Sequence, residues 1–208
     1  WLMKKIWDKT FTKIHTNKRM LVFLFTLLFM AVLFGSFFAT KLGQNDLNEI
    51  KTSLESFFTM TKQNQLQPIQ AFFQTFGANI SFAIAIWILG ISVIGAPLMI
   101  VLFFMKAFTL GFTIASLIKI YHMKGLLYSF IYVFPHQVIN LLVFTFFIMF
   151  SMSLSITLFQ ALIKKKTVDF SKIVNRYLFV LVFTVVILII TALLEIYLMP
   201  FLFRMVLS

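Results

Sequence analysis

The chain has 208 residues, of which 61% are hydrophobic and 12% are charged, and 29 are phenylalanine. A soluble protein of this length could not bury so much apolar surface, so the composition predicts a membrane protein. The net charge of +12 does not indicate nucleic-acid binding, because the basic residues stand in short clusters between apolar segments. The lack of cysteine excludes disulfides, thiolate metal sites and a thiol nucleophile.

The first nineteen residues carry six basic side chains against one acid, and apolar residues recur among them at near-helical spacing. This pattern predicts a basic amphipathic segment on the cytoplasmic face of the membrane, although a solvated tail that only fixes orientation explains the charge equally well. Residues 20–40 are apolar and uncharged, and are long enough for a first transmembrane helix. Ala31, Gly35 and Ala39 form a ridge of small residues on it, where another helix can approach closely.

Residues 41–78 form the one sizeable polar stretch, and their balanced charge suits the outer side of the membrane. We expect two amphipathic helices here, the second opened by Pro68, resting on the membrane surface. Their apolar face is a candidate outer partner face, and packing against the protein's own bundle is the alternative. The residues of this face are Leu54, Phe57, Phe58, Phe72, Phe73 and Phe76.

Residues 79–106 are predicted as the second transmembrane helix, tilted or kinked at Pro97 because 28 residues exceed the thickness of the hydrocarbon. A lysine is costly at mid-membrane, so Lys106 is expected to mark a cytoplasmic turn. Residues 107–121 then form a short third crossing, with Lys119 reaching the far interface. This crossing carries a second ridge of small residues: Ala107, Gly111 and Ala115.

Residues 125–163 carry no charge and are too many for one simple crossing. Pro135 predicts a break, with a half-helix at 125–134 and a fourth crossing at 137–163, and a single kinked helix is the alternative. The basic segment 164–176 then predicts a cytoplasmic loop before a last crossing at 177–199. The predicted fold is an all-α polytopic membrane protein with five transmembrane helices, its N-terminus inside and its C-terminus outside.

Polar groups at membrane depth are the candidates for function. Pro135, His136, Gln137 and Asn140 form a candidate intramembrane polar site, whose roles could be helix packing, ion handling or a partner contact. Glu195 is expected to reach the outer interface. Ser151 and Ser155, four residues apart, are expected to be helix-packing contacts.

The sequence gives little support for catalytic activity or for binding of a metal or cofactor. No histidine has a second ligand at metal-site spacing, and the usual catalytic and nucleotide-binding motifs are missing. We therefore expect no enzyme, no catalytic residue, no metal and no cofactor. An intramembrane hydrolase would have only His136 as its base.

The apolar core of the sequence resembles a known family. The run WILGISVIGAPLMIVLFFMKAFTLGFTIASLI, followed by GLLYSFIYVFPHQVIN and a serine-bearing helix that ends in KKK, is similar to stage II sporulation protein M of endospore-forming bacteria. The resemblance is strongest over residues 72–163. The marks that carry it are the ordered residues Gly90, Gly95, Pro97, Lys106, Gly111 and Pro135.

The resemblance implies a non-enzymatic multi-pass protein of the septal mother-cell membrane that acts in engulfment of the forespore. It implies a complex with two cell-wall hydrolases, the stage II sporulation proteins D and P, which remodel peptidoglycan. A transporter or channel for a small solute or an ion, with a site near Pro97, Pro135, His136 and Asn140, is the alternative. Formation of a homo-oligomer stays open.

Overall fold

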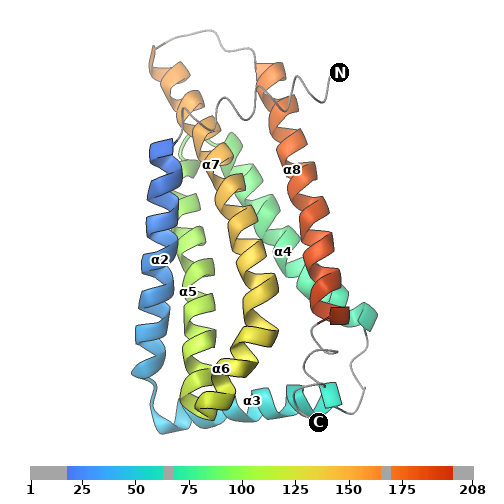
Figure 1. Cartoon of the computed structure of the whole chain (residues 1–208). Coiled ribbons are helices and arrows are strands. Elements are labelled where there is room, and N and C mark those ends of the chain that lie inside the picture. Colours follow the sequence, from blue (N-terminus) through green and yellow to red (C-terminus); the bar gives the residue numbers. More distant parts are fainter. Residues whose placement is uncertain (1–17, 63–67, 165–169, 199–208) are drawn as a thin grey trace.

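The computed structural model describes residues 18–62, 68–164 and 170–198, and in these residues every regular element is a helix (Figure 1). Five helices are long and apolar enough to cross a membrane, which confirms the predicted all-α protein with five spans. The predicted basic segment at the N-terminus falls largely outside the described residues. The elements are α2 (Lys18–Thr40), α3 (Gln44–Lys62), α4 (Pro68–Ile91), α5 (Gly95–Tyr121), α6 (Met123–Tyr128), η1 (Ser129–Val133), α7 (Phe134–Lys164), α8 (Phe170–Leu193) and η2 (Leu194–Leu198), of which η1 and η2 are π-helical.

The turn between the second and third spans lies at residues 92–94 and not at Lys106. The chain can reverse there because Gly95 has no side chain: a Cβ atom on it would overlap the carbonyl oxygen of Leu89. Pro97 lies in the first turn of α5, where its missing N–H group has no intrahelical partner to lose, so it starts a helix instead of kinking one. The predicted spans 79–106 and 107–121 were therefore wrong.

Residues 68–78 do not form a separate surface helix, as the sequence suggested, but are the first turns of α4. The span that contains them runs from Ile69 to Ile91. Two of its polar side chains, Thr75 and Asn79, find partners inside the bundle, so the helix can enter the apolar layer there.

Residues 123–164 are helical throughout, so the predicted half-helix and fourth crossing form one bent helix. The helix follows a tight turn at His122, which adopts a positive φ of 52°. Gly125 then lies so close to α5 that a Cβ atom would overlap the carbonyl oxygen of Leu117. The π-helical segment η1 lies directly before Pro135, and its wider turn accommodates the ring and the lost backbone donor.

The polar segments separate to the two ends of the bundle (Figure 1). At one end α2 begins, α4 turns into α5, and α7 is followed by α8. At the other end α3 crosses the bundle, α6 turns back, and η2 ends the described chain. The end where α2 begins is the one predicted from charge to face the cytoplasm, and that orientation stays a prediction. Lys106 lies within α5 and belongs to neither end.

Helix α7 is the centre of the bundle. Buried residues make up 56% of its most apolar stretch, against at most 28% in the other four spans. Phe144, Phe147 and Ile148 of α7 pack in the core with Phe103 and Met99 of α5. Exposed phenylalanines, leucines and valines cover the outer faces of α2 and α8, as expected for helices that face lipid.

Candidate functional site

Polar side chains from α4, α5, α7 and η2 meet inside the bundle. Nε2 of His136 lies 3.6 Å from Oε2 of Glu195, and the hydroxyl of Thr75 donates a hydrogen bond to the other carboxylate oxygen at 3.3 Å. Nζ of Lys106 donates to the side-chain carbonyl of Asn79 at 3.0 Å. These five residues, called the polar cluster below, connect segments that lie far apart in the sequence.

Lys106 is held by two kinds of contact. Besides its hydrogen bond to Asn79, the ammonium group lies 5.3 Å from the ring centroid of Phe82 and 5.6 Å from that of Phe144, which are favourable cation–π positions. Its charge is also attracted by the carboxylate of Glu195. A lysine at this depth would otherwise cost about 2.5–3.5 kcal/mol, so these contacts explain why it need not mark a turn.

Glu195 was expected to reach the outer interface. It lies in η2, near the end of the bundle predicted to face outside (Figure 1), but only 17% of its side chain is exposed, because the side chain turns towards His136. The reason is local. Glu195 belongs to the π-helical segment η2, and His136 follows shortly after the π-helical segment η1. Such wider turns change the direction of the side chains next to them and are frequent at functional sites.

The predicted polar site on α7 divides between different partners. His136 joins the polar cluster, whereas Asn140, four residues later, accepts a hydrogen bond from the hydroxyl of Thr191 at 2.7 Å. Asn140 is 1% exposed, so it ties α7 to α8 in a closed environment. Pro135 is half-buried, and Gln137 turns towards a cavity. Within the described ranges, no three histidine, aspartate or glutamate side chains gather closely enough to hold a metal ion.

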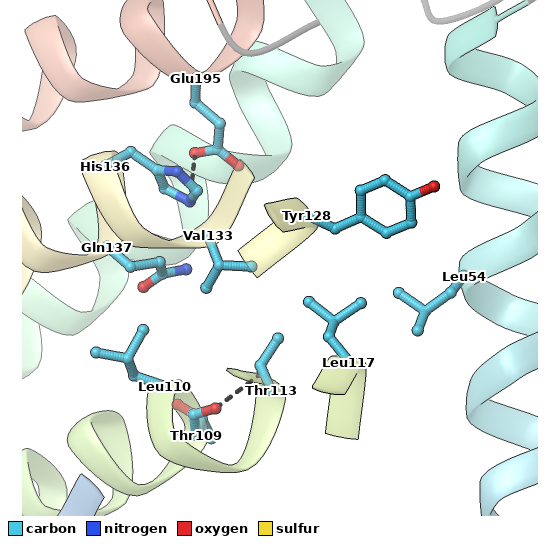
Figure 2. A pocket seen from close by; sticks show the side chains of 10 residues that line it. All are labelled: Leu54, Thr109, Leu110, Thr113, Leu117, Tyr128, Val133, His136, Gln137 and Glu195. Atoms are coloured by element: carbon cyan, nitrogen blue, oxygen red, sulfur yellow. Dashed lines mark hydrogen bonds and ion pairs between the residues drawn. The ribbon is translucent and has the colours of Figure 1, made fainter. Parts of the chain in front are cut away.

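A cavity of about 340 Å³ adjoins the polar cluster (Figure 2). Its polar side chains His136, Gln137 and Glu195 lie at one end, and Leu54 of α3 lies at the opposite end. The remaining lining residues are Thr109, Leu110, Thr113, Leu117, Tyr128 and Val133. The space can therefore bring a small molecule or water next to the buried carboxylate.

A second group of contacts joins α4, α7 and α8 around Tyr177. Its hydroxyl lies 2.8 Å from Oγ of Ser151, and it also lies 3.3 Å from the carbonyl oxygen of Ile86. A Cβ atom on Gly90 would overlap this hydroxyl. Ser155 donates to the carbonyl oxygen of Ser92 at 2.8 Å and so fixes the turn between α4 and α5. These are helix-packing roles, and Tyr177 was missed because nothing in the sequence marks its distant partners.

The two ridges of small residues pack against each other. Gly35 of α2 faces the backbone of Phe108, and Gly111 of α5 faces the backbone of Val32, so closely that a Cβ atom on either glycine would overlap a carbonyl oxygen. Ser36 adds a hydrogen bond of 3.1 Å to the carbonyl oxygen of Gly111. The flanking small residues are Ala31, Ala39 and Ala107, which are buried, and Ala115, which is half-buried. The ridges therefore hold α2 against α5.

The candidate outer partner face is divided by the structure. Leu54 points towards the cavity, and the half-buried rings of Phe72 and Phe76 stack at 5.5 Å on α4. Phe73 is 65% exposed. The side chains of Phe57 and Phe58 lie outside the described part of the structure. The residues named for this face thus do not share one orientation.

A bundle of five apolar helices, long enough to cross a membrane and packed around an apolar core with a few polar contacts, defines a multi-pass α-helical membrane protein. The sequence model of the family described as stage II sporulation protein M matches residues 22–200, which is most of the chain. The chain therefore belongs to the stage II sporulation protein M family, and it is a membrane protein of sporulation. Comparisons with curated proteins and with solved structures give no significant match.

Proposed function

We propose that this protein is a non-enzymatic scaffold that anchors or recruits peptidoglycan hydrolases at the septal mother-cell membrane during engulfment of the forespore. Membership of the stage II sporulation protein M family supports this proposal. The proposed partners are the stage II sporulation proteins D and P, as the resemblance of the sequence implies. Such a scaffold needs a surface that partners can reach outside the lipid layer.

Helix α3 is the best candidate for that surface, and its position is the observation that carries the proposal. It lies across one end of the bundle and is rich in polar residues (Figure 1). Its outward side chains Asn48, Lys51 and Glu55 are exposed, while Leu54 attaches the helix to the bundle. The small-residue ridges of α2 and α5 are occupied by each other and leave no backbone groove there for a partner helix.

Site-specific crosslinking in sporulating cells tests the proposal. A photoreactive amino acid at Asn48 on α3 is compared with one at Ser92, an exposed residue at the opposite end of the bundle. We expect the two wall hydrolases to be recovered with the α3 probe and not with the Ser92 probe. Recovery of neither hydrolase with the α3 probe, at normal protein levels, would contradict a scaffold that uses this end.

A second candidate function, a transporter or channel, is favoured by the cavity beside His136 and Glu195. The site first suggested for it is not a single place, because Pro97 lies at the opposite end of the bundle from Pro135. Proteoliposomes loaded with a pH-sensitive dye would detect ion-coupled flux. Flux that Glu195→Gln abolishes would support this function, and tight vesicles with the unchanged protein would argue against it.

A further inference from the structure

Two cavities meet beneath α3. The first contains the His136 and Glu195 side chains, and the second, of about 390 Å³, is lined by residues of α3 and α5 that include Glu49 and Ser116. Both are lined by Leu54, Thr113 and Leu117, so the two spaces adjoin along these three residues. Taken together, this space has an exposed glutamate of α3, Glu49, in the lining of one part and the partly buried carboxylate of Glu195 in the lining of the other.

Several polar groups along this space can only accept hydrogen bonds from a ligand. The hydroxyls of Thr109 and Thr113 donate their protons to carbonyl oxygens of α5 at 2.8 Å, and that of Ser53 donates to the carbonyl oxygen of Glu49 at 3.0 Å. A hydroxyl whose proton is used in this way offers only its lone pairs to a ligand. With the carboxylates of Glu49 and Glu195, the lining therefore favours a ligand rich in donors.

Positive charge is missing from the lining, since neither cavity is lined by a described lysine or arginine. Lys106 is attracted to Glu195 from outside the cavity, but its ammonium group is engaged by Asn79 and by two aromatic rings. A cationic ligand would thus meet two carboxylates, and at Glu195 it would share the carboxylate with His136, whose Nε2 lies 3.6 Å from Oε2.

Ser116 supplies an independent sign of a binding site. It is 2% exposed and lines the second cavity, and among the described residues its hydroxyl has no hydrogen-bond partner. A buried hydroxyl left without a partner costs about 1–3 kcal/mol, so such groups usually have one. A molecule in the adjoining space would provide it.

We propose that this space binds a small linear aliphatic amine, with a protonated amino group at Glu195. The alkyl chain lies along Leu54 and Leu117, and a second amino group reaches Glu49 at the α3 end. The lining fits such a molecule because the residues common to both cavities include the apolar side chains of Leu54 and Leu117, while each cavity contributes one carboxylate. The proposal is independent of the scaffold function and of any transport.

Isothermal titration calorimetry on the full chain in detergent, with 1,5-diaminopentane as the probe, tests this site. 1,5-Pentanediol, which has the same length and no charge, is the control ligand. We expect the diamine to bind and the diol not to. We expect the affinity to fall about tenfold in Glu195→Gln and in Glu49→Gln, as loss of a hydrogen bond to a charged group predicts.

Two further variants keep the test decisive if Glu195→Gln fails to fold. Ser116→Ala removes only the buried hydroxyl and should weaken diamine binding about fivefold, with an unchanged circular dichroism spectrum. Glu55→Gln makes the same charge change as Glu49→Gln on an exposed residue of α3 that lines neither cavity, and it should bind like the unchanged protein. Absent diamine binding, equal binding of the diol, or unchanged affinity in both Glu49→Gln and Ser116→Ala would overturn the proposal.

Discussion

The contact between α2 and α5 and the contacts of α4 with α7 and α8 hold the same bundle in different ways. Along α2 and α5, small residues let the two backbones touch. Ser36 and Lys119 add hydrogen bonds to facing carbonyl oxygens, those of Gly111 and Thr40. Around α7, larger side chains meet through hydroxyl, amide and charged groups such as Tyr177, Asn140 and Glu195. The first contact leaves no space between the two backbones, and in the second the space between the helices is spanned by side chains.

This difference has a physical basis. In lipid there is no hydrophobic force between helices, so association depends on close packing and on interhelical hydrogen bonds. A helix pair that uses packing alone needs glycine or alanine at the interface. A helix pair that uses polar contacts can stay farther apart, because long side chains span the gap. We therefore expect substitutions in the two regions to differ in size and in how they combine.

The largest effect is expected from Gly111→Ala. The added methyl group would overlap the carbonyl oxygen of Val32, and a backbone cannot move aside as a side chain can. We expect a loss of about 3 kcal/mol in the free energy of unfolding, measured by SDS titration in mixed micelles with circular dichroism.

Gly77→Ala is the matched control for Gly111→Ala, because nothing lies within 4 Å of a Cβ atom at Gly77. There the change should be neutral or stabilise the helix by about 0.5–1 kcal/mol. Equal effects of the two substitutions would show that α2 and α5 do not depend on their close approach.

The second largest effect is expected from Lys106→Met. We expect the free energy of unfolding to fall by about 2 kcal/mol, because Asn79 loses its donor and Glu195 loses a compensating charge. The same unfolding assay applies. Combining it with Glu195→Gln should destabilise less than the sum of the single changes, since no buried charge then lacks its partner. Strict additivity would argue against an electrostatic link between α5 and η2.

Tyr177→Phe is expected to lower the free energy of unfolding by about 1 kcal/mol. It removes a hydroxyl that contacts Ser151 and the carbonyl oxygen of Ile86. The same variant should reduce the cost of Gly90→Ala, because the hydroxyl of Tyr177 is the atom nearest to the new methyl group. Unfolding curves of both single variants and the double variant measure this coupling. A Gly90→Ala cost that does not change in the Tyr177→Phe background would contradict the contact.

The smallest effect is expected from Thr191→Val. We expect it to lower the free energy of unfolding by about 0.6 kcal/mol, a value typical of one hydrogen bond between membrane helices. It removes the donor to Asn140 and keeps the side-chain shape. Thr26→Val is the control, since the hydroxyl of Thr26 binds only its own helix on the exposed face of α2. A larger loss for Thr26 than for Thr191 would show that the bond between α7 and α8 adds no stability.

Several features of the fold were readable from local sequence. The apolar runs predict five spans because each must match the thickness of a bilayer. The ridges at Gly35 and Gly111 mark close helix contact because only small residues permit it. The irregularity near Pro135 follows from the missing N–H group of proline, and the structure contains it as the π-helical segment η1.

The positions at which helices begin and end inside long apolar runs could not be predicted from local sequence. A lone lysine in lipid is costly, which predicts a helix end at Lys106, whereas the turn lies at residues 92–94 and carries no charge. The sequence contained one overlooked signal: Glu195 and Lys106 are opposite charges in separate apolar segments, and such charges in a membrane tend to pair.

The sequence by itself determined that the chain is a membrane protein with five helices long and apolar enough to span a bilayer, and that it belongs to the stage II sporulation protein M family, because these follow from composition and local order. Only the tertiary structure decided where the charges and the cavity lie. Glu195 is brought to Thr75 and His136 by the packing of α4, α7 and η2, and the cost of a buried charge depends on those distant partners and not on its neighbours in the chain.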